Sequence, residues 1–225
     1  MSLPAPYYCE DGITIYCGDC REIMPEGEAD VMVTDPPYGM AYQSGYGAGW
    51  LPVAGDESPA IRDIALALWG DDRPAAVFGT WRIERPQRTR QLLVWDKSDA
   101  IGPGMGNLNM AFGSSHEEVY LLGEWPCREG FSRRPSVLRT SQGQGSRGGV
   151  VYLSGHPTAK PVGLLVRLLE VGPAGTVLDP FMGSGTTLVA AKQLGRKAVG
   201  IEIEERYCEV AVQRLAQGVL PLEAP

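Results

Sequence analysis

The last fifty residues constrain the fold most, because short apolar strands and amphipathic helices alternate there without interruption. The pattern predicts strands over residues 176–179 and 198–202, each followed by a helix, over 186–194 and 205–217. Alternation of this kind favours a mainly parallel sheet with helices on both faces. We therefore expect an α/β fold.

The same alternation continues upstream in a looser form. In the helix expected over 59–69, Ile61, Ile64, Ala65 and Leu68 share one face, which we expect to be buried. Residues 39–58 and 124–154 show no periodicity, and loops of that length in compact domains usually have a function. The other expected elements are strands at 13–17, 31–35, 75–78, 92–95 and 119–122, and helices at 19–24 and 160–170.

Length and composition suit one cytoplasmic domain spanning residues 1–225. Apolar residues make up 44% and charged residues 21%, as in ordinary globular proteins. We expect no membrane association, since no apolar run approaches the roughly 20 residues that span a bilayer and the N-terminus lacks signal-peptide features. The five cysteines are odd in number and irregularly spaced, so we expect free thiols. Cys17 and Cys20 lack a second pair, and no metal site is expected.

Positive charge is concentrated in one segment although the net charge is −7. Binding of nucleic acid depends on where charges lie rather than on their sum. A glycine-rich segment of this kind is either a solvated linker or a DNA-contacting loop. Against the single acid Glu129, the segment between residues 126 and 156 carries Arg128, Arg133, Arg134, Arg139 and Arg147.

A glycine turn joins the strand at 176–179 to the following helix. Gly183 and Gly185 allow the backbone to approach a ligand closely, and the helix N-terminus behind them favours a carboxylate or phosphate. Glu202 ends the next strand, where an acid accepts hydrogen bonds from ribose hydroxyls. A dinucleotide-binding fold has the same order of strand, glycine turn, helix and acid along the chain. The full G-x-G-x-x-G motif is absent here, which disfavours a nicotinamide cofactor.

The second informative motif is Asp35-Pro36-Pro37-Tyr38, at the end of the strand over 31–35. Each proline fixes φ and restricts the residue before it, so the Asp35 carboxylate and the Pro36 carbonyl are aimed rigidly. These two acceptors suit the exocyclic amine of a nucleobase, on which Tyr38 would stack. A carboxyl pKa near ~4 fits such an acceptor. The structural alternative is a proline-rich turn.

Together the two motifs resemble those of the DNA amino-methyltransferases that act on adenine N6 or cytosine N4. In the arrangement called class beta, D-P-P-Y precedes the F-x-G-x-G cofactor turn, as it does here. The resemblance implies a circularly permuted Rossmann-like fold with a mainly parallel seven-stranded sheet, one strand of it antiparallel. It also implies a short inserted target-recognition segment at about 124–155.

The resemblance implies S-adenosylmethionine as cofactor and assigns residues to it. Gly18-Asp19 matches the G-D element, and residues 156–161 match H-P-T-x-K-P. Residues 93–97 and 116–119 match, more weakly, segments that border the base pocket. Structural alternatives are an N-cap role for Asp19, a surface position for Lys160 and structural roles for both histidines. The implied cofactor-binding residues are Asp19, Thr158, Lys160, Asp179, Phe181, Gly183, Ser184, Gly185, Thr186 and Glu202.

The activity implied is methylation of a flipped adenine at N6 in double-stranded DNA, with Asp35, Pro36, Pro37 and Tyr38 as catalytic residues. D-P-P-Y more often accompanies adenine, and N4-cytosine is the alternative. The segment 126–154 would select the target, acting alone or within a homodimer, in a restriction-modification or viral setting. Other readings are an inactive regulator, a nicotinamide oxidoreductase, an RNA or protein-amide substrate, and a cytosine-C5 enzyme using Cys127.

Overall fold

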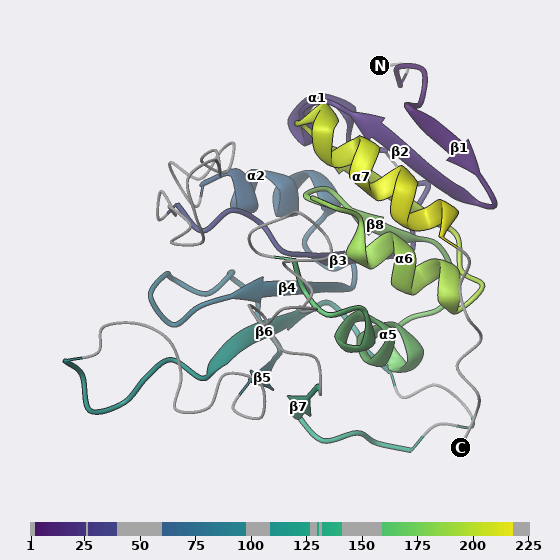
Figure 1. The fold of residues 1–225 in the computed structure, drawn as a ribbon. Helices are drawn as coiled ribbons and strands as arrows, with labels where there is room; N and C mark the ends of the chain where they lie inside the picture. Colours follow the sequence, from purple (N-terminus) through teal and green to yellow (C-terminus); the bar gives the residue numbers. More distant parts are fainter. Residues whose placement is uncertain are drawn as a thin grey trace.

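The computed structural model describes residues 3–25, 27–39, 60–97, 109–126, 130, 132–140 and 159–217. These residues form a nine-stranded sheet (Figure 1). In spatial order its strands are β1 (Tyr8–Glu10), β2 (Ile13–Cys17), β9 (Ala198–Glu202), β8 (Val177–Asp179), β3 (Val31–Thr34), β4 (Ala75–Gly79), β6 (His116–Leu122), β5 (Gln91–Asp96) and β7 (Val137–Arg139).

The centre of the sheet agrees with the predicted seven-stranded arrangement. Strands β2, β9, β8, β3 and β4 pair in parallel, and β6 runs antiparallel to both β4 and β5. The strands β1 and β7 were missed and extend the sheet at its two edges. Each has only three residues, too few for a period-2 pattern to show, and β7 lies in a segment predicted to be a loop. The circular permutation stays a prediction.

Helices cover both faces of the sheet, as predicted. Helices α5 (Val162–Val171), α6 (Thr186–Gln193) and α7 (Glu205–Ala216) pack on one face, and α1 (Cys20–Ile23) and α2 (Ala60–Trp69) on the other (Figure 1). Successive strand residues point to opposite faces. In β3, Val31 and Val33 therefore join the α5–α7 core, whereas Met32 joins the α1–α2 core.

The buried face of α2 differs from the predicted one. Ile64 and Leu68 are 42% and 47% exposed, and the buried residues are Arg62, Ala65 and Trp69. These three share a helical stripe at i, i+3 and i+7. The large Trp69 ring fills the core, and Arg62 is satisfied by donating to a backbone carbonyl in the loop after β4. Apolar spacing alone did not reveal that an arginine takes a core-facing position.

The described part of the chain contains neither a helix long and apolar enough to cross a membrane nor a group of three His, Cys, Asp or Glu side chains able to hold a metal ion. Its cysteines, Cys9, Cys17, Cys20 and Cys208, are free thiols. Cys127 lies outside the described residues.

Candidate active site

The two sequence motifs meet at one edge of the sheet. Strands β3 and β8 are parallel neighbours, so the segments that follow them leave the sheet at the same edge. The Thr34 hydroxyl donates a buried hydrogen bond of 2.7 Å to Oδ1 of Asp179. Asp35 follows Thr34 directly and Asp179 opens the glycine turn. The two sequence motifs, 145 residues apart, are therefore joined by a direct side-chain contact.

The glycine turn between β8 and α6 is built by backbone geometry. Gly183 and Gly185 have φ of 50° and 78°, in the left-handed region that favours glycine. Asp179 stabilises the turn by accepting from the Phe181 N–H at 3.1 Å, and burial raises the Asp179 pKa to about 6. A Cβ on Gly185 would lie 2.7 Å from Cβ of Ala211 in α7. Gly185 is thus needed for helix packing as well as for the turn.

Glu202, at the end of β9, faces the same turn. Its carboxylate accepts from the N–H of Gly183 at 3.0 Å and from the N–H of Glu204 at 2.8 Å. Burial nevertheless raises its pKa to about 7. A carboxylate has about four acceptor positions, so these two bonds leave capacity for donors from a ligand. The glycines, the start of α6 and this acid fit a nucleoside cofactor.

Ser184 and Thr186 are held by an arginine whose contact with the glycine turn was not predicted from the sequence. Nη1 of Arg214, in α7, donates to the carbonyl and hydroxyl oxygens of Ser184 at 2.6 and 3.0 Å and to the Thr186 hydroxyl at 3.1 Å. Burial lowers the Arg214 pKa. The first turn of α6 is therefore fixed from behind by α7.

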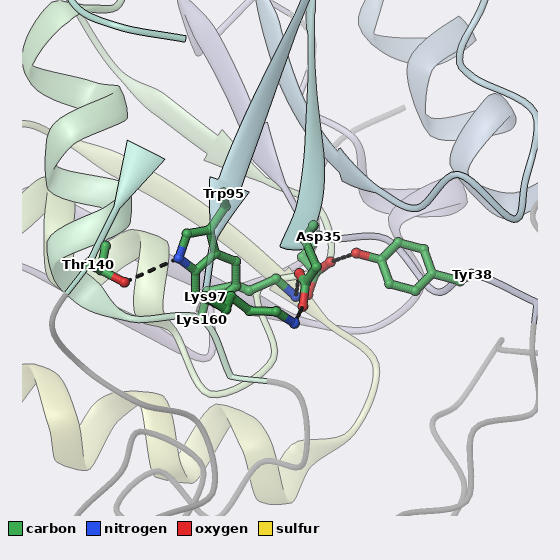
Figure 2. Close-up of polar contacts among 7 residues, drawn as sticks. Asp35, Tyr38, Trp95, Lys97, Thr140 and Lys160 are labelled. Atoms are coloured by element: carbon green, nitrogen blue, oxygen red, sulfur yellow. Dashed lines mark hydrogen bonds and ion pairs between the residues drawn. The ribbon is translucent and has the colours of Figure 1, made fainter. Parts of the chain in front are cut away.

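Asp35 lies partly buried after β3, next to the buried Pro36. The Tyr38 hydroxyl donates to Oδ1 of Asp35 at 2.5 Å, so the aromatic ring is tied to the acid (Figure 2). Burial raises the Asp35 pKa above its ordinary value, an effect larger than the lowering by Lys160. The expectation of an ordinary carboxyl pKa near ~4 was therefore wrong, because it ignored the loss of hydration.

Asp35 is the first of four charged side chains that alternate in sign and contact one another in series, Asp35, Lys160, Glu117 and Lys97. Figure 2 shows Lys160 and Lys97 beside Asp35. The Lys160 ammonium forms an ion pair with Oδ2 of Asp35 and lies 3.4 Å from Oε2 of Glu117. Lys97 donates to Oε1 of Glu117 at 2.7 Å. Lys160 was predicted beside the cofactor; here it touches the predicted catalytic acid.

The pKa shifts in this cluster follow from the pairing. Burial alone would raise the Glu117 pKa, but Lys160 and Lys97 outweigh it and lower the value. Burial alone would lower the Lys160 pKa, but Asp35 and Glu117 raise it. The surrounding charges therefore stabilise the ionised form of Glu117 more than they stabilise the ionised form of Asp35.

Comparison with known proteins places the chain in a family. A family model described as DNA methylase, N6_N4_Mtase, matches residues 80–213. This chain belongs to that N6/N4 DNA methylase family. The match includes β5, β6 and the whole glycine turn, with Lys97, Glu117 and Lys160.

Relatives of the methylase extend over most of its length. The Escherichia coli (strain K12) protein named "Putative methylase YubD" is 32% identical over 216 residues, which cover 88% of each chain. Type II methyltransferase M.ScaI of Streptomyces caespitosus is 26% identical over 268 residues, covering 95% of this chain and 84% of that one.

Solved structures share the fold of the methylase. PvuII DNA methyltransferase (cytosine-N4-specific) has a TM-score of 0.67 at 19% identity, over 96% of this chain and 90% of that one. The M1.HpyAVI-SAM complex has a TM-score of 0.61 at 22% identity, over 90% of this chain and 99% of that one.

Other predicted site residues of the methylase have structural partners. Asp19 caps α1 by accepting from the Arg21 N–H at 2.9 Å and forms an ion pair with the Arg21 guanidinium. The neighbouring Gly18 N–H donates to the Glu202 carbonyl at 2.8 Å, so Asp19 lies near the end of β9. Thr158 and His156 lie outside the described residues.

The predicted DNA-contacting arginines of the methylase differ in their surroundings. Arg133 and Arg134 are exposed. Arg139, in β7, forms an ion pair with Asp96 at 3.1 Å. Arg128 and Arg147 lie outside the described residues.

Glu117 and Lys97 received no role from sequence reasoning, although both stood in segments noted as bordering the base pocket. The available signal was weak, because Glu117 stands between His116 and Glu118 in the polar first part of β6. A buried charge needs a partner, but the sequence did not show that the partners would be Lys97 and Lys160.

Proposed function

We propose that this methylase transfers a methyl group from S-adenosylmethionine to the exocyclic N6 of an adenine flipped out of double-stranded DNA. The observation that carries the proposal is the Thr34–Asp179 hydrogen bond, which holds Asp35 beside the turn of Gly183 and Gly185. A donor above the turn and an amine at Asp35 would then lie within one site.

The cofactor assignment rests on the chemistry of the turn and on family membership. Positive φ at Gly183 and Gly185 lets the backbone approach a ligand, and Glu202 retains acceptor capacity for ribose hydroxyls. S-adenosylmethionine, when bound, supplies a methyl group on a positively charged sulfur. The complex of the structural neighbour M1.HpyAVI with SAM supports this choice.

Asp35 would act as an acceptor and as a counter-charge. Its carboxylate and the carbonyl of Pro36 would accept the two amine N–H groups, which favours a pyramidal and more nucleophilic nitrogen. As the new N–C bond forms, positive charge develops on nitrogen, and the carboxylate stabilises it. The amine proton leaves after transfer, and the raised Asp35 pKa makes this carboxylate a suitable first acceptor for it.

Adenine is favoured over cytosine by the Asp35-Pro36-Pro37-Tyr38 motif, which in this family more often accompanies N6 activity. N4-cytosine methylation is the second candidate, because the neighbour PvuII DNA methyltransferase is cytosine-N4-specific. Both bases present an exocyclic amine with a delocalised lone pair, so the mechanism at Asp35 would be the same.

DNA contact is proposed for the arginine-rich segment within about 124–155. Exposed Arg133 and Arg134 suit phosphate or guanine contacts, whereas Arg139 would first have to leave Asp96. The same proposal includes a single domain with this segment inserted, a homodimer and a restriction-modification setting.

Base identity can be tested directly. The purified protein would be incubated with double-stranded DNA and S-adenosylmethionine labelled in the methyl group, and the DNA digested to nucleosides for mass spectrometry. We expect label in N6-methyladenine and none in N4-methylcytosine. Label only in N4-methylcytosine would support the second candidate, and unlabelled DNA from folded, cofactor-binding protein would contradict the proposed function.

A further inference from the structure

One carboxylate oxygen in the charge cluster around Asp35 has an ion-pair contact but no hydrogen bond among the described residues. The Lys160 ammonium lies between two carboxylates, in contact with Oδ2 of Asp35 and 3.4 Å from Oε2 of Glu117. Among the described residues, no hydrogen bond of normal geometry reaches this buried Glu117 oxygen. Burying a carboxylate oxygen without a donor is unfavourable. The oxygen is therefore a ready acceptor within reach of an ammonium group.

The ion pair between Lys160 and Asp35 conflicts with the proposed role of Asp35. During methyl transfer this carboxylate would stabilise positive charge developing on the target nitrogen. A lysine ammonium touching the same carboxylate offsets that stabilisation, because like charges a few ångströms apart repel strongly in a poorly hydrated site. Lys160 thus has to withdraw from Oδ2 for Asp35 to act fully.

Glu117 is held where it can receive the withdrawn ammonium. Lys97 fixes Oε1 at 2.7 Å, and Trp95 is the β5 residue that pairs with Glu117 in the sheet register. Trp95 is itself anchored by a hydrogen bond of 3.1 Å from its Nε1 to the Thr140 hydroxyl (Figure 2). The Lys160 ammonium, by contrast, lies at the end of a flexible four-carbon side chain. It needs only a short movement to reach Oε2 of Glu117, which is 3.4 Å away.

We propose that Glu117 is a positioning residue that takes the Lys160 ammonium from Asp35 when the target amine binds. Asp35 then exchanges the ammonium for a neutral amine that gains positive charge only as the new N–C bond forms, and the four charged groups of the cluster keep their total charge. Before substrate arrives, the ion pair with Lys160 opposes the effect of burial on the Asp35 pKa. The inference rests on the proposed function, because it assigns a step to the binding of the amine at Asp35.

The test compares single-turnover rates at saturating cofactor and DNA across a range of pH. In Glu117→Gln, Lys160 loses the Glu117 carboxylate and is held more firmly by Asp35, so we expect the plateau rate to fall about tenfold or more with unchanged cofactor affinity. The acid limb of the pH profile should move to lower pH, because Lys160 now holds Asp35 ionised more strongly. The other groups facing Asp35, Tyr38 and Asp179, are unchanged.

The double variant Glu117→Gln/Lys160→Met makes the test specific. Removing the stranded ammonium should restore most of the plateau rate, with the acid limb displaced to higher pH because Asp35 has lost its counter-ion. A structural role for Glu117 would make the double variant slower still. Glu118→Gln is the matched control, since this neighbouring carboxylate on β6 bonds to Tyr120 instead, and its plateau should stay within about twofold.

Two results would overturn the inference: a Glu117→Gln plateau equal to that of the unaltered protein, or no recovery in the double variant. In both, the unaltered protein still methylates DNA, which distinguishes them from failure of the proposed function. If Glu117→Gln does not fold, Glu117→Asp retains the charge one methylene further from Lys160. The plateau rate of Glu117→Asp should lie between those expected for the unaltered protein and for Glu117→Gln, and adding Lys160→Met should restore it.

Discussion

The two halves of the site are built from different interactions. On the cofactor side, Gly183 and Glu204 donate backbone N–H groups to Glu202, and the glycine turn sets the shape. On the base side, ionised side chains dominate, with Asp35 and Glu117 paired to two lysines. A backbone-built pocket is rigid and suits a cofactor that is always the same. A side-chain cluster can exchange partners, which the proposed base site requires.

The largest effect is expected from Asp35→Ala, which should separate the two halves. Methyl transfer should fall by at least about 100-fold to 1,000-fold, since the variant loses both the amine acceptor and the counter-charge. Cofactor affinity should stay within about twofold, because the turn is held by other residues. Single-turnover assays and calorimetry measure the two quantities. A parallel loss of cofactor binding in a folded variant would show that the halves are not independent.

Gly185→Ala should damage the cofactor half through its backbone. The new Cβ would lie 2.7 Å from Ala211 in a residue with φ of 78°, so unfolding free energy should fall by about 2–4 kcal/mol. Gly195→Ala is the matched control, with φ of 64° and no atom within 4 Å of the added carbon. It should cost only about 1–2 kcal/mol. Urea unfolding measures both, and equal losses would contradict the packing role of Gly185.

Thr34→Val removes the hydrogen bond that joins the halves while keeping the side-chain shape. Asp179 stays buried with one donor fewer, so stability should fall by about 1–3 kcal/mol. The loss should grow as the pH rises through about 6, where Asp179 ionises. Urea unfolding at several pH values checks this. A pH-independent loss would show that the hydroxyl does not support the charged form.

Glu202→Gln tests whether cofactor affinity in the backbone-built half of the site depends on pH through this one carboxylate. Burial raises the Glu202 pKa to about 7, and ribose hydroxyls favour the ionised acceptor. Cofactor binding should therefore weaken up to about tenfold for each pH unit below 7 and level off above it. The glutamine variant should bind more weakly with little pH dependence. Calorimetry from pH 5.5 to 8.5 measures this.

The pH dependence of folding stability should be opposite to that of cofactor binding, because stability falls where cofactor affinity rises. A carboxyl group whose pKa is raised in the folded state contributes stability below its unfolded value of 4.5, and this is lost as the pH rises through about 7. The cofactor-free protein should thus lose stability over that window, and Glu202→Gln should remove most of the loss. An unchanged urea profile in the variant would assign the pH effect to another group.

Much of the fold was predictable because it depends on local patterns. The centre of the sheet and the glycine turn follow from β-branched strands, from helical spacing, and from residues with narrow backbone preferences such as Pro36 and Gly183. The errors have physical reasons. The edge strands β1 and β7 are too short for periodicity to register, and the exposed Ile64 shows that apolar spacing does not decide which face of a helix is buried when Trp69 is available.

The sequence by itself determined the two motifs on which the site is built, because Asp35, Glu202 and the glycines stand in segments whose backbone is locally constrained. Tertiary structure decided how those groups are partnered. Lys160 contacts Asp35 rather than lying over the surface. Glu117 and Arg214 also contact residues of the site, which was not predicted from the sequence. The reason is that ionisation and hydrogen bonding at a buried group depend on neighbours distant in the chain, and only the packed sheet brings β3, β6 and the start of α5 together.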